Sequence, residues 1–348
     1  MVPVVDLSRR GARFAAAFGA GCEELARSGS FLLGAHLERF EREFAAAVGS
    51  PNAVAVSSGA SALQLGLAAL GIGPGDEVIV PAFTAVPTAT AVAAVGATPV
   101  FVDVDAATAC LDPLLVGRSM TARTKAVIVV HLYGFPGVLP DVPVPVVGDA
   151  AQAHGALDHT GREAFTAYSF YPTKNLGGIG DGGAVVTHRD DLAARVRTRR
   201  VHGMSQQYLH EVVSQNFRMS EVEAMWLELV LPALADDTAR RRSIAQRYRI
   251  AAPHLRWQRA HERHVMHLCV FRTTERERCR GQLAGSGVST AIHYPLSLPE
   301  QPAFADLTAA ECPEAAAWAA ECVTVPCFPE MTDDEVDLVA GALAGLAA

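Results

Sequence analysis

The fold class is decided by residues 52–81, which read NAVAVSSGASALQLGLAALGIGPGDEVIVP. A short apolar run opens the stretch, and the small-residue turn SSGAS (57–61) leads directly into a helical pattern that closes on glycine. A second apolar run, DEVIVP (76–81), follows. Strand, helix and strand in this order are typical of a parallel sheet with a crossover helix, so the stretch predicts an α/β protein.

The same alternation continues on both sides of this stretch. Upstream, HLERFEREFAAAVG (36–49) has the helical period and ends on Gly49, a suitable residue for a helix C-cap. Downstream, further strands are predicted in TPVFVDVD (98–105), KAVIVVHLYG (125–134), VPVVGD (144–149), AYSFYPTK (167–174) and GGAVVTHRD (182–190). Apolar strands separated by helical stretches indicate a mostly parallel sheet that is covered on both faces.

The C-terminal third has a different pattern. A long helical stretch covers residues 220–252 and is interrupted near Pro232. Strands are then predicted in VMHLCVFRT (265–273) and STAIHYP (289–295), and helices in EAAAWAAEC (314–322) and TDDEVDLVAGALAG (332–345). We therefore expect a large α/β domain over residues 1–231 and a smaller α+β domain over residues 232–348.

Composition limits the function. The chain has 348 residues, of which 50% are apolar and 19% charged, enough to bury a large core. Its 29 basic and 37 acidic residues give a net charge of −8, so it lacks the basic surface expected of a protein that binds nucleic acid or anionic membranes. No signal peptide, membrane-spanning run or CxxC pair is visible. We expect a soluble cytoplasmic protein with reduced thiols and neither nucleic acid nor membrane as a partner.

The basic residues are very unevenly divided, with 27 arginines and two lysines, Lys125 and Lys174. Such a bias exchanges lysine for arginine wherever charge alone matters. A remaining lysine is therefore a candidate for chemistry that a guanidinium cannot perform, such as forming an imine. Lys125 precedes an apolar strand and is interpreted as surface charge, whereas Lys174 lies in the Ser-, Tyr- and Gly-rich segment SFYPTKNLGGIGDGG (169–183).

Three candidate groups follow predicted strands, at the edge where α/β sheets bind ligands. The SSGAS turn opens a helix whose N–H groups and dipole suit a phosphate, although an ordinary capped helix start would explain the same residues. Asp149 ends a strand, and a carboxylate there requires a cationic or N–H partner. Lys174 is the third. A phosphate cradle, an acid for a ring N–H and an imine-forming lysine together match the requirements of pyridoxal 5′-phosphate (PLP).

These segments also resemble the DegT/DnrJ-type sugar aminotransferases, a family of fold-type-I PLP enzymes. The resemblance covers nearly the whole chain and is carried by SSGASALQLGLAALGIGPGDEVIVP, GDAAQAHGA, SFYPTKNLGGIGDGGAVVT, NFRMSEVEAM and IHYPLSLPEQPAF. It implies a large domain with a mixed, mostly parallel, seven-stranded sheet and a smaller C-terminal domain. It also implies PLP as the cofactor.

Carried over by motif position, the resemblance implies roles for single residues. Lys174 corresponds to the Schiff-base lysine and Asp149 to the partner of the pyridine nitrogen. Gln152 corresponds to the residue beside the pyridoxal ring and its 3-oxygen. The positions that correspond to phosphate-binding residues are Ser58, Gly59, Ala60, Ser169 and Asn216. Because the family's asparagine at the Asn216 position reaches the phosphate of the neighbouring subunit, the resemblance implies a homodimer with shared active sites.

Four further residues are candidates for substrate contact. Phe83 follows the strand DEVIVP, and His293 and Tyr294 lie in a stretch that the resemblance places at the mouth of the site, with core packing as the alternative. Arg218 would pair with the carboxylate of the amino donor or form a salt bridge between subunits. HERHVMH (261–267) has an HxxH spacing but no carboxylate in register, so we interpret these histidines as structural and expect no metal site.

The sequence departs from the family pattern at three positions. The family's SGT reads SGA here, so Ala60 supplies no hydroxyl. Ala85 stands where many members have an aromatic residue that stacks on the ring, and Pro299 stands where the family has a histidine. FTAVPTATA (83–91) instead resembles a subgroup that includes enzymes acting on 3-keto sugar nucleotides. None of these changes removes a chemically indispensable group.

The resemblance implies an aminotransferase that moves an amino group from glutamate or glutamine to a keto sugar. The expected acceptor is a dTDP-, UDP- or GDP-linked 3- or 4-keto-deoxyhexose of amino-sugar or antibiotic biosynthesis. Two alternatives stay open within the same scaffold, a keto-cyclitol aminotransferase and an aminodehydroquinate-aromatising enzyme. A third alternative is a catalytically idle partner subunit.

Overall fold

A seven-stranded sheet with the order β1-β7-β6-β5-β4-β2-β3 forms the centre of the computed structural model, which describes residues 1–307 and 310–346. Strands β2 to β6 are parallel, and β7 is antiparallel to both of its neighbours. The strands are β1 (Asn52–Val56), β2 (Glu77–Pro81), β3 (Thr98–Val102), β4 (Thr124–Val130), β5 (Val146–Asp149), β6 (Phe165–Ser169) and β7 (Gly183–Thr187). The predicted mixed, mostly parallel sheet of an α/β fold is confirmed.

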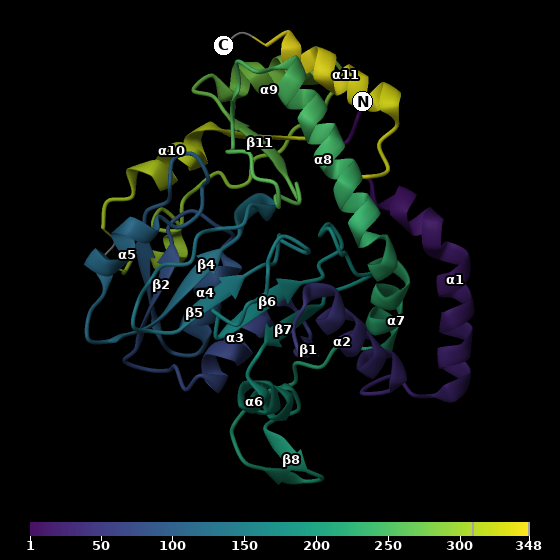
Figure 1. Ribbon diagram of the computed structural model, residues 1–348, viewed down its shortest axis with the longest axis vertical. Coiled ribbons are helices and arrows are strands. Elements are labelled where there is room, and N and C mark those ends of the chain that lie inside the picture. Colours follow the sequence, from purple (N-terminus) through teal and green to yellow (C-terminus); the bar gives the residue numbers. More distant parts are fainter. Residues whose placement is uncertain (308–309, 347–348) are drawn as a thin grey trace.

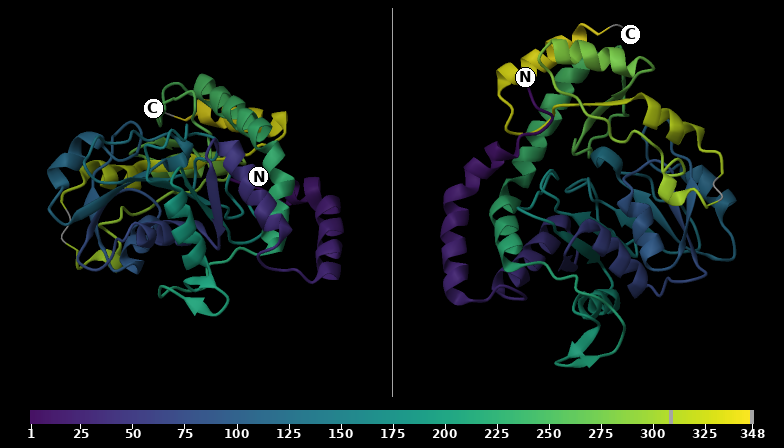
Figure 2. Two further views of the ribbon diagram at one scale, coloured as in Figure 1. Left: turned by 60° about the horizontal axis from the view of Figure 1, so that its bottom comes forward. Right: turned by 180° about the vertical axis from the view of Figure 1, so that it is seen from behind.

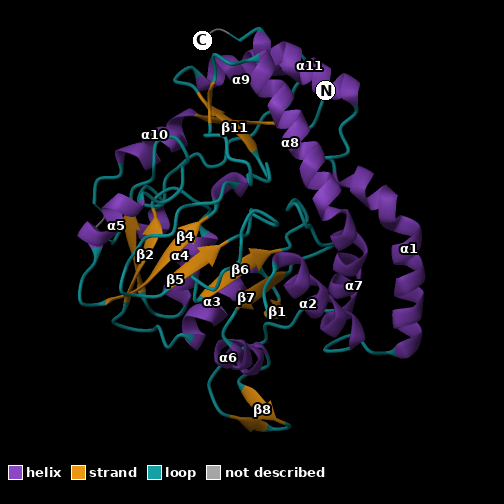
Figure 3. Ribbon diagram, in the orientation of Figure 1, coloured by secondary structure: helices purple, strands orange, loops and turns teal. Residues whose placement is uncertain are grey.

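Helices cover both faces of this sheet, as Figures 1 and 3 show. They are α1 (Leu7–Ser28), α2 (Ala35–Val48), α3 (Gly59–Ala69), α4 (Pro87–Ala94), α5 (Pro113–Ser119), α6 (Asp190–Arg200) and α7 (Glu221–Val230), with a 3₁₀ turn, η1 (Leu132–Gly134). In β1, Val54 packs in the core with α3, α4 and α6, whereas Ala55 packs in the core with α2 and α7. Successive side chains of a strand point to opposite faces, and because both faces are covered the strand is apolar throughout.

A second, three-stranded sheet lies above the carboxyl edge of the first in Figure 1. Its strands are β10 (Arg256–Trp257), β11 (Cys269–Arg272) and β12 (Cys322–Val325). The helices of this part are α8 (Leu234–Ala251), α9 (Arg276–Gly285), α10 (Pro313–Glu321) and α11 (Asp333–Ala344), with a 3₁₀ turn, η3 (Pro302–Phe304). Val2 forms an isolated β-bridge with Val288, so the N-terminal residues belong to the layer of the molecule that contains the second sheet.

The long helical stretch after Arg218 has the predicted interruption. Helix α7 ends at Val230, a 3₁₀ turn, η2, covers Leu231–Ala233, and α8 begins at Leu234. Pro232 lacks an N–H and cannot continue the helical hydrogen-bond ladder. Figure 2 shows α8 continuing from the level of the main sheet to the second sheet, so this segment connects the two layers.

One predicted strand is wrong. STAIHYP (289–295) forms no strand, and its only ladder contact among the described residues is the bridge from Ala291 to Thr324. After that contact the chain leaves the second sheet and presents His293 and Tyr294 to a cavity. The apolar alternation of the segment therefore reflects packing beside the sheet rather than pairing within it.

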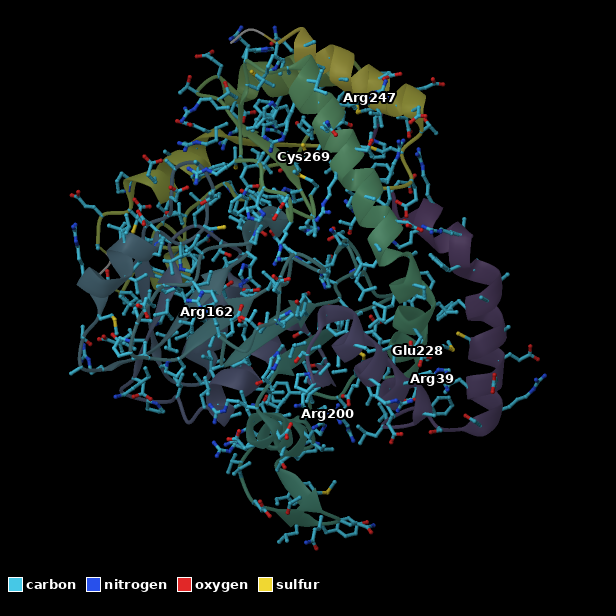
Figure 4. All side chains as sticks on the ribbon, in the orientation of Figure 1. Arg39, Arg162, Arg200, Glu228, Arg247 and Cys269 are labelled. Carbon is cyan, nitrogen blue, oxygen red and sulfur yellow. The ribbon has the colours of Figure 1, made fainter. Side chains whose placement is uncertain are left out.

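The basic run RVRTRR (195–200) lies on α6. Arg197 of this run is exposed, whereas Arg200 is buried and pairs with Glu41 at 2.5 Å (Figure 4). Beyond α6 a short hairpin, β8 (Met204–Gln206) and β9 (Leu209–His210), projects away from the sheet (Figure 1). On the opposite face of the main sheet, helices α2 and α7 are joined by an ion pair between Arg39 and Glu228 (Figure 4).

No helix in the described part of the chain is both long and apolar enough to span a lipid bilayer.

Candidate active site

A cavity of about 250 Å³ opens where β1, β4, β5 and β6 end. These four strands point in the same direction, so the residues that follow them meet at one edge of the sheet. Seven of the residues that the sequence singles out line this cavity together: Ser58, Gly59, Ala60, Asp149, Gln152, Ser169 and Lys174. Topology therefore brings together groups that lie more than a hundred positions apart in the chain.

One end of the cavity is the N-terminus of α3. Ser58 caps this helix, accepting from the backbone N–H of Ser61 while the Ser61 hydroxyl accepts from the N–H of Ser58. At Gly59 and Gly183 the backbone is too crowded for any residue but glycine. A Cβ on Gly59 would lie 2.6 Å from the Cβ of Ser169, and one on Gly183 would lie 2.2 Å from the carbonyl oxygen of Ser58. A helix N-terminus with this close backbone approach fits a phosphate group.

Asp149 lies deep in the same cavity. Its carboxylate accepts from the Thr88 hydroxyl at 2.8 Å and from the backbone N–H of Ala151 at 3.1 Å. Burial raises the pKa of Asp149, whereas these two hydrogen bonds and the charge of Lys174 act in the opposite direction. No cationic side chain of the described residues lies within salt-bridge distance of it. Such a carboxylate suits a ligand that supplies an N–H or a positive charge.

Lys174 lies at the junction of two cavities. Burial lowers the pKa of its amine to about 8, and the nearby Asp149 carboxylate opposes that shift. The turn that carries it is fixed by backbone contacts. The N–H of Lys174 donates to Tyr171 O at 2.8 Å, and buried Arg10 of α1 donates to the carbonyl oxygens of Pro172 and Lys174 at 3.2 Å. A fixed amine with a lowered pKa is suited to nucleophilic attack on a carbonyl carbon.

Gln152 connects the two layers of the molecule. Its Oε1 accepts from the N–H of Tyr133 at 2.6 Å, and its Nε2 donates to the Tyr294 hydroxyl at 3.0 Å. The Tyr133 hydroxyl in turn donates to the carbonyl oxygen of His293. Both functional ends of the amide are therefore held by protein, so its side chain presents a fixed surface to the cavity.

A second cavity of about 240 Å³ adjoins the first and shares Gln152, Tyr171 and Lys174 with it. Its other walls come from the N-terminal segment, from α8 and from the segments that flank the strands of the second sheet, with His293 and Tyr294 among them. This location agrees with the expectation that these two residues lie at the site.

Three predicted site residues lie elsewhere in this chain. Phe83 is fully buried in the core beside Trp318, with ring centroids 6.2 Å apart, and lines neither cavity, which corrects the expectation that it contacts substrate. Asn216 is exposed, and its Oδ1 accepts from Arg218 Nε at 2.9 Å. Asn216 and Arg218 line neither of the two cavities described above.

Two histidines of HERHVMH (261–267) contact neighbouring side chains. His264 is buried and hydrogen-bonded to Gln258 Oε1 at 2.9 Å, and His261 lies edge-on to Phe135. Across residues 1–307 and 310–346, no group of three or more His, Cys, Asp or Glu side chains is arranged to hold a metal ion.

Sequence reasoning missed two contributors to this region, Thr88 and Arg241. Thr88 lies in the helical run TATAVAAVGA, where only the register of α4 reveals that its hydroxyl faces Asp149. Arg241 is the middle residue of Arg-Arg-Arg on α8 and lines the second cavity. In a chain rich in arginine, nothing in the local pattern distinguishes it from its neighbours.

The groups of the first cavity fit PLP well. The α3 N-terminus suits its phosphate, Asp149 suits its protonated ring nitrogen, and Lys174 suits its aldehyde. The fold and the site together define a PLP-dependent aminotransferase. The chain belongs to the DegT/DnrJ/EryC1/StrS aminotransferase family, whose model matches residues 14–344.

Three similar proteins illustrate the relationship. The chain is 40% identical to a dTDP-3-amino-3,4,6-trideoxy-α-D-glucose transaminase of Streptomyces venezuelae, over 95% of this chain and 92% of the relative. The structure of S. venezuelae DesV is similar with a TM-score of 0.94 and 38% identity, covering 100% and 99% of the two chains. Bacillus subtilis NtdA, solved with bound cofactor PMP, has a TM-score of 0.91 and 27% identity, covering 98% and 84%.

Proposed function

We propose that this protein transfers an amino group from glutamate or glutamine to a nucleotide-linked keto sugar. The observation that carries the proposal is the convergence of Lys174, Asp149 and the α3 N-terminus on one cavity that adjoins a second cavity. The similarity to a transaminase of a dTDP-3-amino sugar supports a nucleotide sugar as the acceptor. A 3-keto sugar is favoured over a 4-keto sugar for the same reason.

In this proposal each residue of the first cavity has a defined task. Ser58, Gly59, Ala60 and Ser169 bind the cofactor phosphate, the first three through the backbone at the α3 N-terminus. Asp149 keeps the ring nitrogen protonated, and Gln152 supports the ring and its 3-oxygen. Bound PLP supplies an electron sink for the pair released when the Cα–H bond of the donor breaks. Lys174 Nζ accepts that proton and later returns one to the substrate carbon.

The acceptor can be tested directly. Holoenzyme charged with glutamate should convert dTDP- or UDP-linked 3-keto sugars to amines, detected by mass spectrometry, and should leave keto-cyclitols and aminodehydroquinate unchanged. Preferential amination of a keto-cyclitol, or aromatisation of aminodehydroquinate, would contradict the proposed substrate class. Failure of glutamate and glutamine to remove the yellow colour and release a 2-oxo acid would instead indicate a catalytically idle subunit.

We further propose that the protein is a homodimer in which Asn216 contacts the phosphate of the opposite subunit. Two observations support this arrangement. Asn216 is exposed and lines neither of the two cavities of its own chain described above. Two large apolar side chains of the segment that carries Lys174, Tyr171 and Ile179, are 52% and 47% exposed, which is typical of a surface that a partner covers.

Subunit mixing tests this proposal. Lys174→Ala and Asn216→Ala proteins should each be inactive or weakly active, but their mixture should regain part of the wild-type rate. Each heterodimer then contains one site with both defects and one site with neither, because a two-fold interface makes the parent sites equivalent. Verified heterodimers without regained activity would mean that Lys174 and Asn216 act in the same subunit.

Location, pathway and domain division complete the proposal. The acidic chain, without a membrane-spanning helix in its described part, is consistent with a cytoplasmic enzyme of antibiotic or other amino-sugar biosynthesis.

We assign residues 1–231 to a large PLP-binding domain and residues 232–348 to a small α+β domain. The start of α8 at Leu234 and the separate second sheet support this boundary.

A further inference from the structure

The second cavity has an unusual charge distribution. Its ionised lining residues are Lys174 and Arg241, and none of its lining residues is an aspartate or a glutamate. Two histidines also face it, but burial lowers the pKa of His293 to about 4 and that of His267 well below its usual value. Both imidazoles are therefore neutral near pH 7. A cavity with two cations and no acid is complementary to an anion.

Arg241 is the group in this cavity whose charge lacks a partner. Four arginines are buried: Arg10, Arg200, Arg241 and Arg272. Arg10, Arg200 and Arg272 each have a carboxylate within salt-bridge distance, at 3.8, 2.5 and 2.9 Å. Arg241 has none among the described residues, and the only hydrogen bond that its guanidinium donates there goes from Nη1 to the carbonyl oxygen of Cys327.

Nearby acids do not satisfy Arg241 either. The Cys327 thiol, and to a lesser degree Glu330 and Asp237, oppose the lowering of the Arg241 pKa by burial. Both carboxylates are engaged by other arginines, Glu330 by Arg10 and Asp237 by Arg13 at 2.9 Å. Burial lowers the pKa of Arg241 to about 10, so the side chain is still charged at neutral pH. A buried guanidinium without a carboxylate is costly, and that cost is offset when a ligand supplies the anion.

We infer that Arg241 binds a carboxylate of the amino-acid donor. An amino acid carries its amine and its α-carboxylate on the same carbon, so a donor whose amine reacts at Lys174 must place the carboxylate nearby. Arg241 lines the same cavity as Lys174, and a guanidinium binds a carboxylate through two parallel hydrogen bonds. This inference rests on the proposed aminotransferase function and names the group that holds its donor.

Arg218 is the competing residue, because the sequence also suggests it for the donor carboxylate. In this chain its Nε donates to Asn216 Oδ1 at 2.9 Å, and it lines neither cavity. It would have to act from the opposite subunit. Binding of the donor carboxylate by Arg241 and binding by Arg218 are therefore different hypotheses, and variants at the two positions distinguish between them.

The test compares the two half-reactions of the holoenzyme in Arg241→Gln. The glutamate concentration for half-saturation of the donor half-reaction should rise at least 30-fold. The keto-sugar half-reaction, started from the pyridoxamine form, should stay within about threefold of wild type. Succinate, an unreactive dicarboxylate, should bind the variant at least tenfold more weakly by calorimetry. For Arg241→Lys, the glutamate concentration for half-saturation and the affinity for succinate should lie between those of Arg241→Gln and wild type. Lysine keeps the positive charge but cannot form the two parallel hydrogen bonds.

Arg249→Gln is the matched control, because Arg249 lies on the same helix and lines neither cavity. It should leave both half-reactions and succinate binding unchanged. The inference is overturned if Arg241→Gln leaves glutamate half-saturation and succinate binding unchanged, if it slows both half-reactions equally, or if only Arg218→Gln weakens succinate binding. If Arg241→Gln fails to fold, glutamate half-saturation and succinate binding of Arg241→Lys test the inference instead. A wild-type protein that reacts with no amino acid would refute the proposed function itself.

Discussion

Lys174→Arg should abolish transamination while leaving the fold intact. Arginine keeps the positive charge at the junction of the two cavities, but a guanidinium neither forms an imine nor transfers the proton. Loss of the proton transfer alone is expected to slow the donor half-reaction by roughly 10²–10⁴-fold. The measurement is single-turnover release of 2-oxoglutarate from glutamate, followed by stopped-flow absorbance.

Borohydride provides a second measurement at the same residue. Reduction of the yellow holoenzyme, followed by peptide mapping, should fix the cofactor to the peptide that contains Lys174. Lys125 is the matched control, because it is the other lysine of the chain, and Lys125→Arg should retain full activity. A label on Lys125, or an unlabelled protein, would refute the assignment of Lys174.

Asp149→Asn should retain the cofactor but slow the donor half-reaction strongly. Asparagine is close to aspartate in shape but does not favour a protonated ring nitrogen, so the electron sink is weakened. Loss of one charge-assisted contact is worth roughly 1.5–3 kcal/mol in binding. The kinetic loss should exceed the corresponding factor, because ring protonation matters more in the transition state than in the ground state.

Thr88→Val is the graded control for this position. It removes the hydroxyl that donates to Asp149 at 2.8 Å but leaves the carboxylate in place. Its rate should lie between those of wild type and Asp149→Asn, with cofactor content unchanged. A turnover close to wild type in Asp149→Asn would exclude Asp149 from supporting the ring nitrogen.

The main sheet could be predicted because each of its strands is a local pattern. Buried parallel strands are apolar throughout, and glycine follows several of the helices, such as Gly49 with φ 73° after α2. The first cavity could be predicted for a related reason. Its residues follow the strands directly, and strand direction alone brings those ends together.

The second cavity could not be predicted in the same way. Arg241 faces it because α8 crosses above the sheet at a particular angle and rotation, which the helical period does not determine. Helix α1 was not predicted either, since Gly11, Gly19 and Gly21 weaken its local helical signal. Phe83 was misassigned because a residue after a strand can turn inward as easily as toward the site, and only packing against Trp318 decides.

The pairing of Val2 with the segment around Val288 has a consequence for biosynthesis of the chain. The N–H of Val2 donates to Gly287 O at 2.7 Å, and the N–H of Ser289 donates to Val2 O at 3.0 Å. Val2 therefore cannot form this contact until the segment around Val288 has been translated. Val4, Val5 and Arg10, which line the second cavity or fix the Lys174 turn, follow directly after that contact. The second cavity is thus completed late in synthesis, because its walls combine Val4 and Val5 with Cys327 and Phe328.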